Sequence, residues 1–218
     1  MSNLLNAIKL DFYTVKSVYR MAALTYLISI IFGFIAQPMV PIFIIMVFSV
    51  FFSGMVFSIY EKNHLNKLYG ILPLGKSDVV MGRYLYAFFF GVVQAVLAGM
   101  IVYVISYVTN TAMDSFALIA TLSLSFLYFC FAIGIAFPIY FKFGFSKAYV
   151  FTMVPIYLLF IGGVFISKKT SALNNLQRMI QYFSAHQGVI LAAGIGLGIL
   201  LLIISCSISY LVYQRSEL

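Results

Sequence analysis

Long stretches of apolar residues, separated by short polar segments, run along the whole chain. Five of these stretches contain no Asp, Glu, Lys or Arg, and they cover residues 21–60, 84–113, 115–141, 148–167 and 179–214. A helix needs roughly 20 apolar residues to cross the hydrocarbon core of a bilayer, so each stretch has room for one or two spans. The apolar runs are continuous, whereas the strands of a membrane barrel would alternate apolar and polar residues.

The polar interruptions divide these stretches into six predicted transmembrane helices. Gln37-Pro38 separates the first two spans by a tight turn, and the polar residues 61–83 separate the second span from the third. A further polar segment, residues 167–187, precedes the last span and is expected outside the cytoplasm. The six spans are expected near residues 21–35, 41–60, 84–108, 115–140, 148–166 and 188–213. The predicted fold class is therefore all-α, a polytopic membrane protein with one transmembrane domain over residues 1–218.

Residues 1–20 have the pattern of an amphipathic helix at the membrane interface. Apolar side chains recur every three or four residues from Leu5 to Tyr19, and polar residues such as Lys9 and Lys16 occupy much of the remaining surface. Such a helix lies among the lipid headgroups with its basic side toward anionic lipid. The alternative is a helix that extends the first span into solvent.

Composition agrees with this pattern, and the basic residues give an orientation. The chain is 64% hydrophobic and 8% charged, against roughly 45–50% and about 25% in ordinary soluble domains. The net charge of +8 comes from basic residues that flank the spans, so anionic lipid rather than nucleic acid is the expected partner. With the amino terminus in the cytoplasm, ten of the thirteen Lys and Arg residues lie inside, and only Lys168, Lys169 and Arg178 lie outside. The positive-inside rule therefore predicts a cell-membrane protein with both termini cytoplasmic.

The sequence predicts no catalytic residue, metal site or cofactor. Residues 70–77 (GILPLGKS) match the nucleotide-binding pattern G-x-x-x-x-G-K-S/T, but polar residues precede them where that site needs a strand. Pro73 also removes one of the backbone amides that would bind phosphate. His64 and His186 are predicted on opposite sides of the membrane. The span interiors contain no Asp, Glu, Lys or Arg to carry a coupling ion, which weakens the case for a secondary transporter, and a membrane-embedded enzyme would lack catalytic groups.

The polar segment at residues 61–83 carries the functional signal. Leu65 and Leu68 can form the apolar side of a short amphipathic helix, and Leu72-Pro73 imposes an extended turn after it. Ser77 is a candidate N-cap for the helix that leads into the third span. A cytoplasmic loop with a short helix and mixed charge is suited to docking a soluble protein. The alternative is a solvated connector.

This layout resembles the permeases of the ABC-2 exporter family, and the residue sequence of the loop at 61–84 is similar too. Those permeases have a Glu, then Leu-Pro followed by an aliphatic residue, Ser or Thr, a basic residue and a later Val, and finally a small–basic–aromatic triplet. Here Glu61-Lys62-Asn63, residues 72–80 (LPLGKSDVV) and Gly82-Arg83-Tyr84 follow this order, with Gly75 in place of Ser or Thr. Among such permeases, the chain looks most like those of phenol-soluble-modulin and bacteriocin-type peptide exporters.

The resemblance implies a transmembrane permease subunit of an ATP-binding-cassette exporter, which forms the translocation pathway. The apolar, aromatic-rich composition, with 23 Phe and 16 Tyr, favours amphipathic or hydrophobic cargo such as peptides or lipid-like molecules. The implied partners of the permease are an ATP-binding subunit and a second permease copy, in a homodimer or a heterodimer. In the family, the loop between the second and third spans couples to the ATPase. The corresponding residues are Glu61, Lys62, His64, Leu65, Lys67, Leu68, Leu72, Pro73, Lys76 and Asp78. The alternative function is an accessory or immunity-type membrane protein that binds peptide without ATP-driven transport.

Gly194 and Gly198 form a G-x-x-x-G pair in the last predicted span. Small residues at this spacing let transmembrane helices approach closely, so both are predicted to be helix-packing residues. The pattern leaves open whether the partner helix belongs to the same chain or to a second copy.

Overall fold

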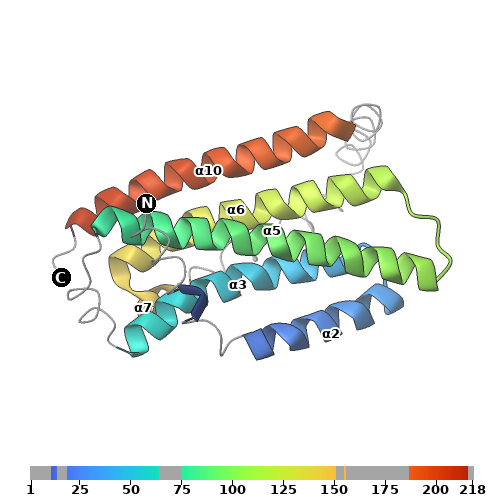
Figure 1. Cartoon of the computed structure of the whole chain (residues 1–218), viewed down its shortest axis with the longest axis horizontal. Helices are drawn as coiled ribbons and strands as arrows, with labels where there is room; N and C mark the ends of the chain where they lie inside the picture. The colour runs from blue at the N-terminus through green and yellow to red at the C-terminus, as the bar shows by residue number, and fades with distance from the viewer. Residues whose placement is uncertain (1–10, 14–18, 64–74, 151–154, 156–186, 216–218) are drawn as a thin grey trace, which may run out of the picture.

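The computed structural model describes residues 11–13, 19–63, 75–150, 155 and 187–215, and these residues form helices joined by short turns, without strands (Figure 1). The helices are α2 (Tyr19–Ile35), α3 (Val40–Lys62), α5 (Lys76–Val108), α6 (Ser115–Phe143), α7 (Phe145–Ala148) and α10 (Gln187–Arg215). Among these, Val40–Lys62, Lys76–Val108, Ser115–Phe143 and Leu191–Arg215 are long and apolar enough to cross a membrane, and Ala22–Ile35 is a shorter apolar helix.

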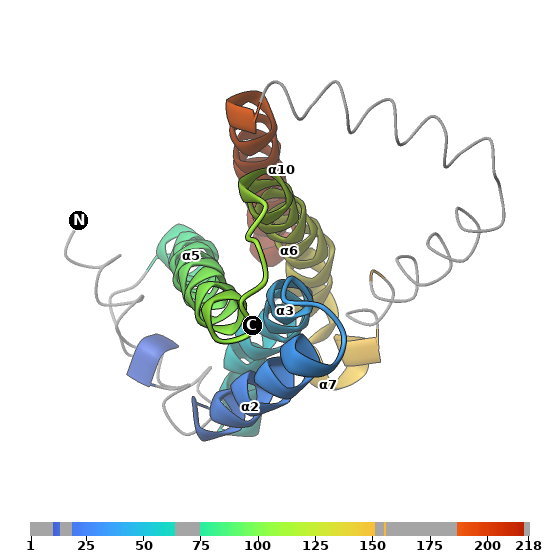
Figure 2. The same ribbon diagram turned by 90° about the vertical axis from the view of Figure 1, so that its right-hand side faces the viewer.

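The long helices lie side by side in an elongated bundle with α3 at its centre (Figures 1 and 2). Helix α3 packs against α2, α5, α6 and α7, whereas α10 packs mainly against α6 and to a smaller extent against α5. Viewed along the bundle, α10 therefore lies at its edge, behind α6 (Figure 2).

Large apolar side chains cover the outside of the bundle as well as its core. Leu27 and Ile31 of α2, Met100 of α5 and Ile203 of α10 are each more than half exposed. A soluble protein of this size rarely exposes so much contiguous apolar surface, and a bilayer is the solvent that favours it. The described helices confirm the prediction of an all-α, polytopic membrane protein.

Five of the six predicted spans have a helix in the described part of the chain. The first, second, fourth and last agree with α2, α3, α6 and α10 to within a few residues. The fifth, near residues 148–166, and the segment 167–187 lie almost entirely outside the described residues, as does most of the predicted interfacial helix at residues 1–20.

Helix α5 begins at Lys76 and contains the third predicted span, residues 84–108, so the helix starts close to the position predicted for the helix that leads into that span. The backbone N–H of Gly75 donates to the carboxylate of Asp78 at 3.3 Å, and this bond supports the first turn of the helix. Ser77 consequently lies inside the helix, and its predicted role as N-cap is wrong; Gly75 is the N-cap residue. The first two turns of α5 are polar and the rest of the helix is apolar. The change from polar to apolar near Tyr84 therefore marks the start of the span and not the start of the helix.

Helix ends elsewhere follow ordinary capping chemistry. The Asp114 carboxylate accepts a hydrogen bond from the N–H of Phe116 at 3.0 Å and caps the start of α6. At the other end of α6, Gly144 has a φ of +78°, a conformation that favours glycine. The chain turns there directly into α7.

Candidate functional site

One end of the bundle carries nearly all of the described charges. The ends of α3, α6 and α10 and the starts of α5 and α7 meet there (Figure 1). At the opposite end, Asp114 is the only Asp, Glu, Lys or Arg among the described residues. The charged residues of these helix ends are Glu61, Lys62, Lys76, Asp78, Arg83, Lys142, Lys147 and Arg215. We call this region the charged end.

Arg83 of α5 is buried at the charged end, with only 4% of its surface exposed. The centre of its guanidinium group lies 4.3 Å from the ring centroid of Phe57 and 4.4 Å from that of Tyr60, both on α3. The ring of Phe141 on α6 is 5.2 Å away. These are cation–π distances, and such contacts are strongest where water is excluded. Arg83 thus joins three helices, although its Nε and Nη2 atoms have no hydrogen-bond partner among the described residues.

The segment before α2 also reaches this cluster. Asp11 is buried and lies in the electrostatic field of Arg83. Burial raises the pKa of the Asp11 carboxyl to about 6, while the positive charge of Arg83 opposes that rise. Next to it, the ring of Phe12 packs edge-on against Tyr86 of α5, with 4.9 Å between the ring centroids. The described residues of this segment are therefore packed against α5.

Glu61, in the last turn of α3, binds the backbone where α6 turns into α7. Its Oε2 atom accepts hydrogen bonds from the N–H groups of Phe145 at 2.8 Å and Ser146 at 3.0 Å. Gly144 precedes them, and a Cβ added there would lie 3.3 Å from the same Glu61 oxygen, besides being strained by the positive φ. The carboxylate therefore links the end of α3 to the start of the next element of the chain.

Four of the ten predicted coupling residues are described, and all four lie at the charged end. Lys62 and Lys76 are exposed, whereas the carboxylates of Glu61 and Asp78 accept hydrogen bonds from within the chain. His64, Leu65, Lys67, Leu68, Leu72 and Pro73 lie outside the described residues. Because α3 ends and α5 begins at the charged end, the connection between them leaves and re-enters the bundle there (Figure 1).

Four interhelical hydrogen bonds hold helices together further along the bundle. The Tyr84 hydroxyl of α5 shares hydrogen bonds with Ser205 at 2.6 Å and Ser209 at 2.7 Å, both on α10. Ser205 is also bonded to the carbonyl oxygen of Gly134 in α6, at 2.7 Å. Interhelical bonds of this kind satisfy polar groups that lipid cannot. In addition, the Tyr26 hydroxyl of α2 donates to Oε1 of Gln94 in α5.

Gly194 and Gly198 lie where α10 approaches α6 within the same chain. A Cβ added at Gly194 would overlap the Ser123 hydroxyl and lie 3.2 Å from the Ser123 carbonyl oxygen. At Gly198 it would lie 3.0 Å from the Cys130 sulfur. Gly196, between them, has nothing within 4 Å of the corresponding position. The structure thus assigns the partner helix that the sequence left open.

Sequence reasoning missed the Arg83 cluster and the Glu61 link. The sequence singled out Glu61 as a coupling residue and Arg83 as part of a family triplet, but it gave no sign of their contacts, since their partners are distant along the chain. The spacing of Phe57 and Tyr60 places two aromatic rings on one face of α3, which is the only local signal for a cation site. In the described part of the chain, no group of three or more His, Cys, Asp and Glu residues could hold a metal ion.

Comparison with known proteins gives one match. The profile of a family described as ABC-2 family transporter protein matches residues 6–214. No curated protein and no solved structure matches the chain.

Proposed function

The chain belongs to the ABC-2 transporter family, and from this premise we propose that it is the permease subunit of an ATP-binding-cassette exporter. Members of the family are membrane components that generally pair with an ATP-binding subunit. We propose further that the charged end lies in the cytoplasm and that the connection after Lys62 docks the ATP-binding subunit. A second permease, identical or similar, would complete the pathway.

The observation that carries this proposal is the place where the α3–α5 connection leaves the bundle. It begins after Lys62 and ends before Lys76, both exposed at the charged end. An excess of Lys and Arg marks the cytoplasmic side of a membrane protein. The connection is therefore available to a soluble cytoplasmic partner, whereas the opposite end has Asp114 as its only charge among the described residues.

The polar groups inside the described spans also favour an external energy source. Apart from Arg83, which lies near the start of α5 at the charged end, the buried polar side chains of the described spans are hydroxyls and one amide, Gln94, none of which is ionised at neutral pH. Transporters that couple to protons or cations ordinarily carry ionisable groups within their spans. A permease driven by ATP hydrolysis in a separate subunit does not need them.

The contacts of the charged end provide a mechanical route from the connection to the spans. Arg83 fixes α5 to α3 and α6, and Glu61 fixes α3 to the turn before α7. Movement of a bound ATP-binding subunit would therefore displace these helix ends together, as in rigid-body switching. We propose that this switching moves amphipathic or hydrophobic cargo, such as peptides, outward across the cell membrane.

A pull-down of the full chain from mild detergent tests the proposal, with co-purified proteins identified by mass spectrometry and ATPase activity. Leu72→Asp and Lys67→Glu alter the apolar and basic character of the connection. Thr111→Asp is the matched control, since it adds a charge to an exposed turn at the opposite end. We expect an ATP-binding protein to accompany the unaltered chain and the control, and to be lost with the two connection variants.

Retention of the ATP-binding protein by both connection variants would refute docking at this loop. If the unaltered chain binds no ATP-binding protein at all, the exporter proposal fails. The chain would then be better described as an accessory or immunity-type protein that binds peptide.

A further inference from the structure

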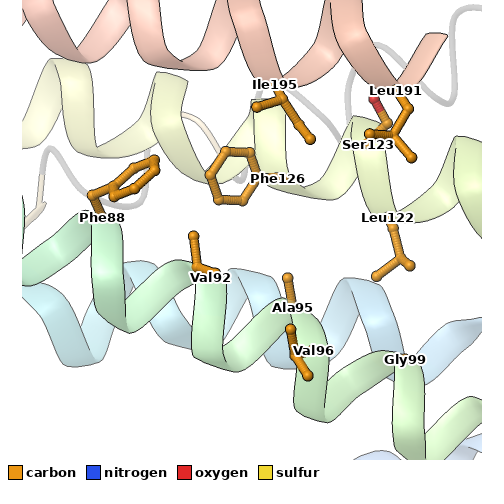
Figure 3. Close-up of a pocket in the computed structure, with 10 residues that line it drawn as sticks. All are labelled: Phe88, Val92, Ala95, Val96, Gly99, Leu122, Ser123, Phe126, Leu191 and Ile195. Atoms are coloured by element: carbon orange, nitrogen blue, oxygen red, sulfur yellow. The ribbon is translucent and has the colours of Figure 1, made fainter. Parts of the chain in front are cut away.

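An apolar groove lies between α5 and α10, with Phe126 of α6 and Leu202 of α10 at its floor, and we call it the α5–α10 groove. It consists of two cavities of about 330 Å³ and about 290 Å³ that share Phe88 as a lining residue. Figure 3 shows the first cavity, where Phe88 and Val92 of α5 face Ile195 of α10 and Phe126 lies between them. The second cavity continues toward the charged end, past Leu85.

The groove offers hydrocarbon and almost no free hydrogen-bonding group. Its floor is buried, with Phe126 6% and Leu202 7% exposed, whereas Ile203 on the rim is 61% exposed. The Tyr84 hydroxyl in the second cavity is already bonded to two serines of α10. A polar ligand would lose its hydrogen bonds to water here without replacement. The occupant of the groove must therefore be a hydrocarbon chain or another apolar surface.

The rim favours a flexible hydrocarbon chain over a second protein helix. Close approach of transmembrane helices depends on small residues. Ala95 and Gly99 of α5 line the first cavity, but the rim also carries large side chains such as Val96, Leu191 and Ile203, which stand in the way of a second helix. The glycines of α10 that permit close contact, Gly194 and Gly198, are already used against α6. An acyl chain can follow the irregular walls, because it adapts its shape by bond rotation.

A positive charge lies just beyond the groove, between the same two helices. The Nζ atom of Lys76 is 5.9 Å from the ring centroid of Tyr213, so the ammonium group of α5 lies over a side chain of α10. Arg215 is exposed in the last turn of α10, and Asp78, two residues after Lys76 on α5, accepts the Gly75 N–H. These three side chains together carry a net positive charge.

The distance between this charge and the groove suits a phospholipid. Along α5, Lys76 precedes the first lining residue, Met81, by about 7.5 Å. The headgroup layer on each side of a bilayer is roughly 5–7.5 Å thick. A phosphate near Lys76 would thus leave the acyl chain level with the groove, and the lysine stem can extend toward the headgroup.

We propose that the α5–α10 groove binds one anionic phospholipid from the leaflet at the charged end, with its acyl chain in the groove and its phosphate at Lys76. Binding of this lipid does not require ATP-driven transport, so its test is independent of the function proposed above. The proposal concerns this one groove and differs from general contact with the bilayer, because it predicts a preference for negatively charged headgroups at one place.

The chain contains no Trp, so a single introduced Trp reports on its own surroundings. Phe88→Trp places the probe at the residue that both cavities share. Phe89→Trp is the matched control, because it is the next residue on α5, is 52% exposed and lines neither cavity. The full-length variants are reconstituted in phosphatidylcholine vesicles that contain either brominated phosphatidylglycerol or brominated phosphatidylcholine, since bromine on an acyl chain quenches Trp fluorescence on contact.

We expect Phe88→Trp to be quenched by the anionic lipid at about five-fold lower mole fraction than by the zwitterionic one, the factor typical of one basic residue near an anionic headgroup. Phe89→Trp should be quenched equally by both lipids. Adding Lys76→Gln should remove the preference at Phe88→Trp. Lys142→Gln, which removes a basic side chain of α6 at the same end, should leave that preference in place.

Equal quenching of Phe88→Trp by the two lipids would overturn the proposal. So would protection of this Trp from both lipids, since the groove would then be filled by protein or another ligand. An equal effect of Lys76→Gln and Lys142→Gln would show general surface attraction and would also overturn it. Should Phe88→Trp fail to fold, Ile203→Trp on the rim of the second cavity replaces it.

Discussion

Replacing Gly194 by alanine tests how α10 is held against α6. The new Cβ would overlap the Ser123 hydroxyl and would lie 3.2 Å from the Ser123 Cβ and carbonyl oxygen. The hydroxyl can rotate away, but the carbonyl oxygen belongs to the backbone of α6, so the two helices must separate slightly. Gly196 provides a matched control on the same helix, because a Cβ there has no neighbour within 4 Å.

The two substitutions share one effect on stability and differ in another. Each replaces a helical glycine by alanine, and this replacement stabilises a helix by roughly 0.5–1 kcal/mol. Only Gly194→Ala overpacks an interface, at a cost of about 1–3 kcal/mol. The difference between the variants is therefore about 1–3 kcal/mol. At roughly 2–4 °C per kcal/mol for a chain of this length, the Tm of Gly194→Ala should be about 2–12 °C below that of Gly196→Ala.

Thermal unfolding of the full-length variants in one detergent measures this difference, and a double-mutant cycle identifies its cause. In a Ser123→Ala background, the part of the Gly194→Ala penalty that comes from the hydroxyl should disappear, whereas the part that comes from the Ser123 carbonyl oxygen should remain. Equal Tm values for Gly194→Ala and Gly196→Ala would refute the reasoning, since they would show that α10 does not approach α6 at Gly194.

Three further predictions concern the charged end. Glu61→Gln weakens the hydrogen bond from the Phe145 amide, because hydrogen bonds to a carboxylate are about twice as strong as neutral ones. We expect the free energy of unfolding to fall by about 1 kcal/mol, measured by thermal unfolding. Lys62→Gln, at the next residue, is the control and should leave Tm unchanged. Arg83→Lys keeps the charge but loses the planar guanidinium over Phe57; we expect a loss of about 1–3 kcal/mol, and an unaltered Tm would contradict the cation–π interpretation. Burial raises the pKa of Asp11 from 3.8 to about 6, so the folded chain holds this proton more tightly than the unfolded chain does. The stabilisation from protonated Asp11 is complete below about pH 4 and is lost as pH rises through about 6. Asp11→Asn should therefore make Tm less dependent on pH over this interval. Identical profiles of Tm against pH for Asp11→Asn and the unaltered chain would argue against burial of the carboxyl.

Much of the charged end could be located from the sequence, but its chemistry could not. The bias of Lys and Arg toward certain loops is visible residue by residue, and it places Lys62 and Lys76 together. The partners of Glu61 and Arg83 are far along the chain, on α6, α7 and α3. Contacts of that kind depend on which helices are neighbours. When every face of a helix is apolar, its pattern of hydrophobic residues does not indicate which face packs against which neighbouring helix.

The start of α5 shows a similar limit on a smaller scale. The third span is predicted to start near Tyr84, because apolar length is the criterion for a span, and Ser77 is the predicted N-cap of the helix that leads into it. The helix begins earlier, at Lys76, since backbone hydrogen bonding and the Asp78 carboxylate support a first turn outside the apolar region. A membrane span and the helix that contains it can thus have different ends.

By itself, the sequence determined that this chain is a multi-pass helical membrane protein and to which family its layout belongs. Those conclusions depend on local quantities, namely the length of apolar runs, the position of charges and the residue sequence of the loop at 61–84. Only the tertiary structure decided that Gly194 faces α6 rather than a second copy, that Arg83 lies among aromatic rings, and that α5 and α10 enclose an apolar groove. Each of these depends on the packing of helices whose surfaces are almost uniformly apolar, so steric fit and a few hydrogen bonds select the arrangement.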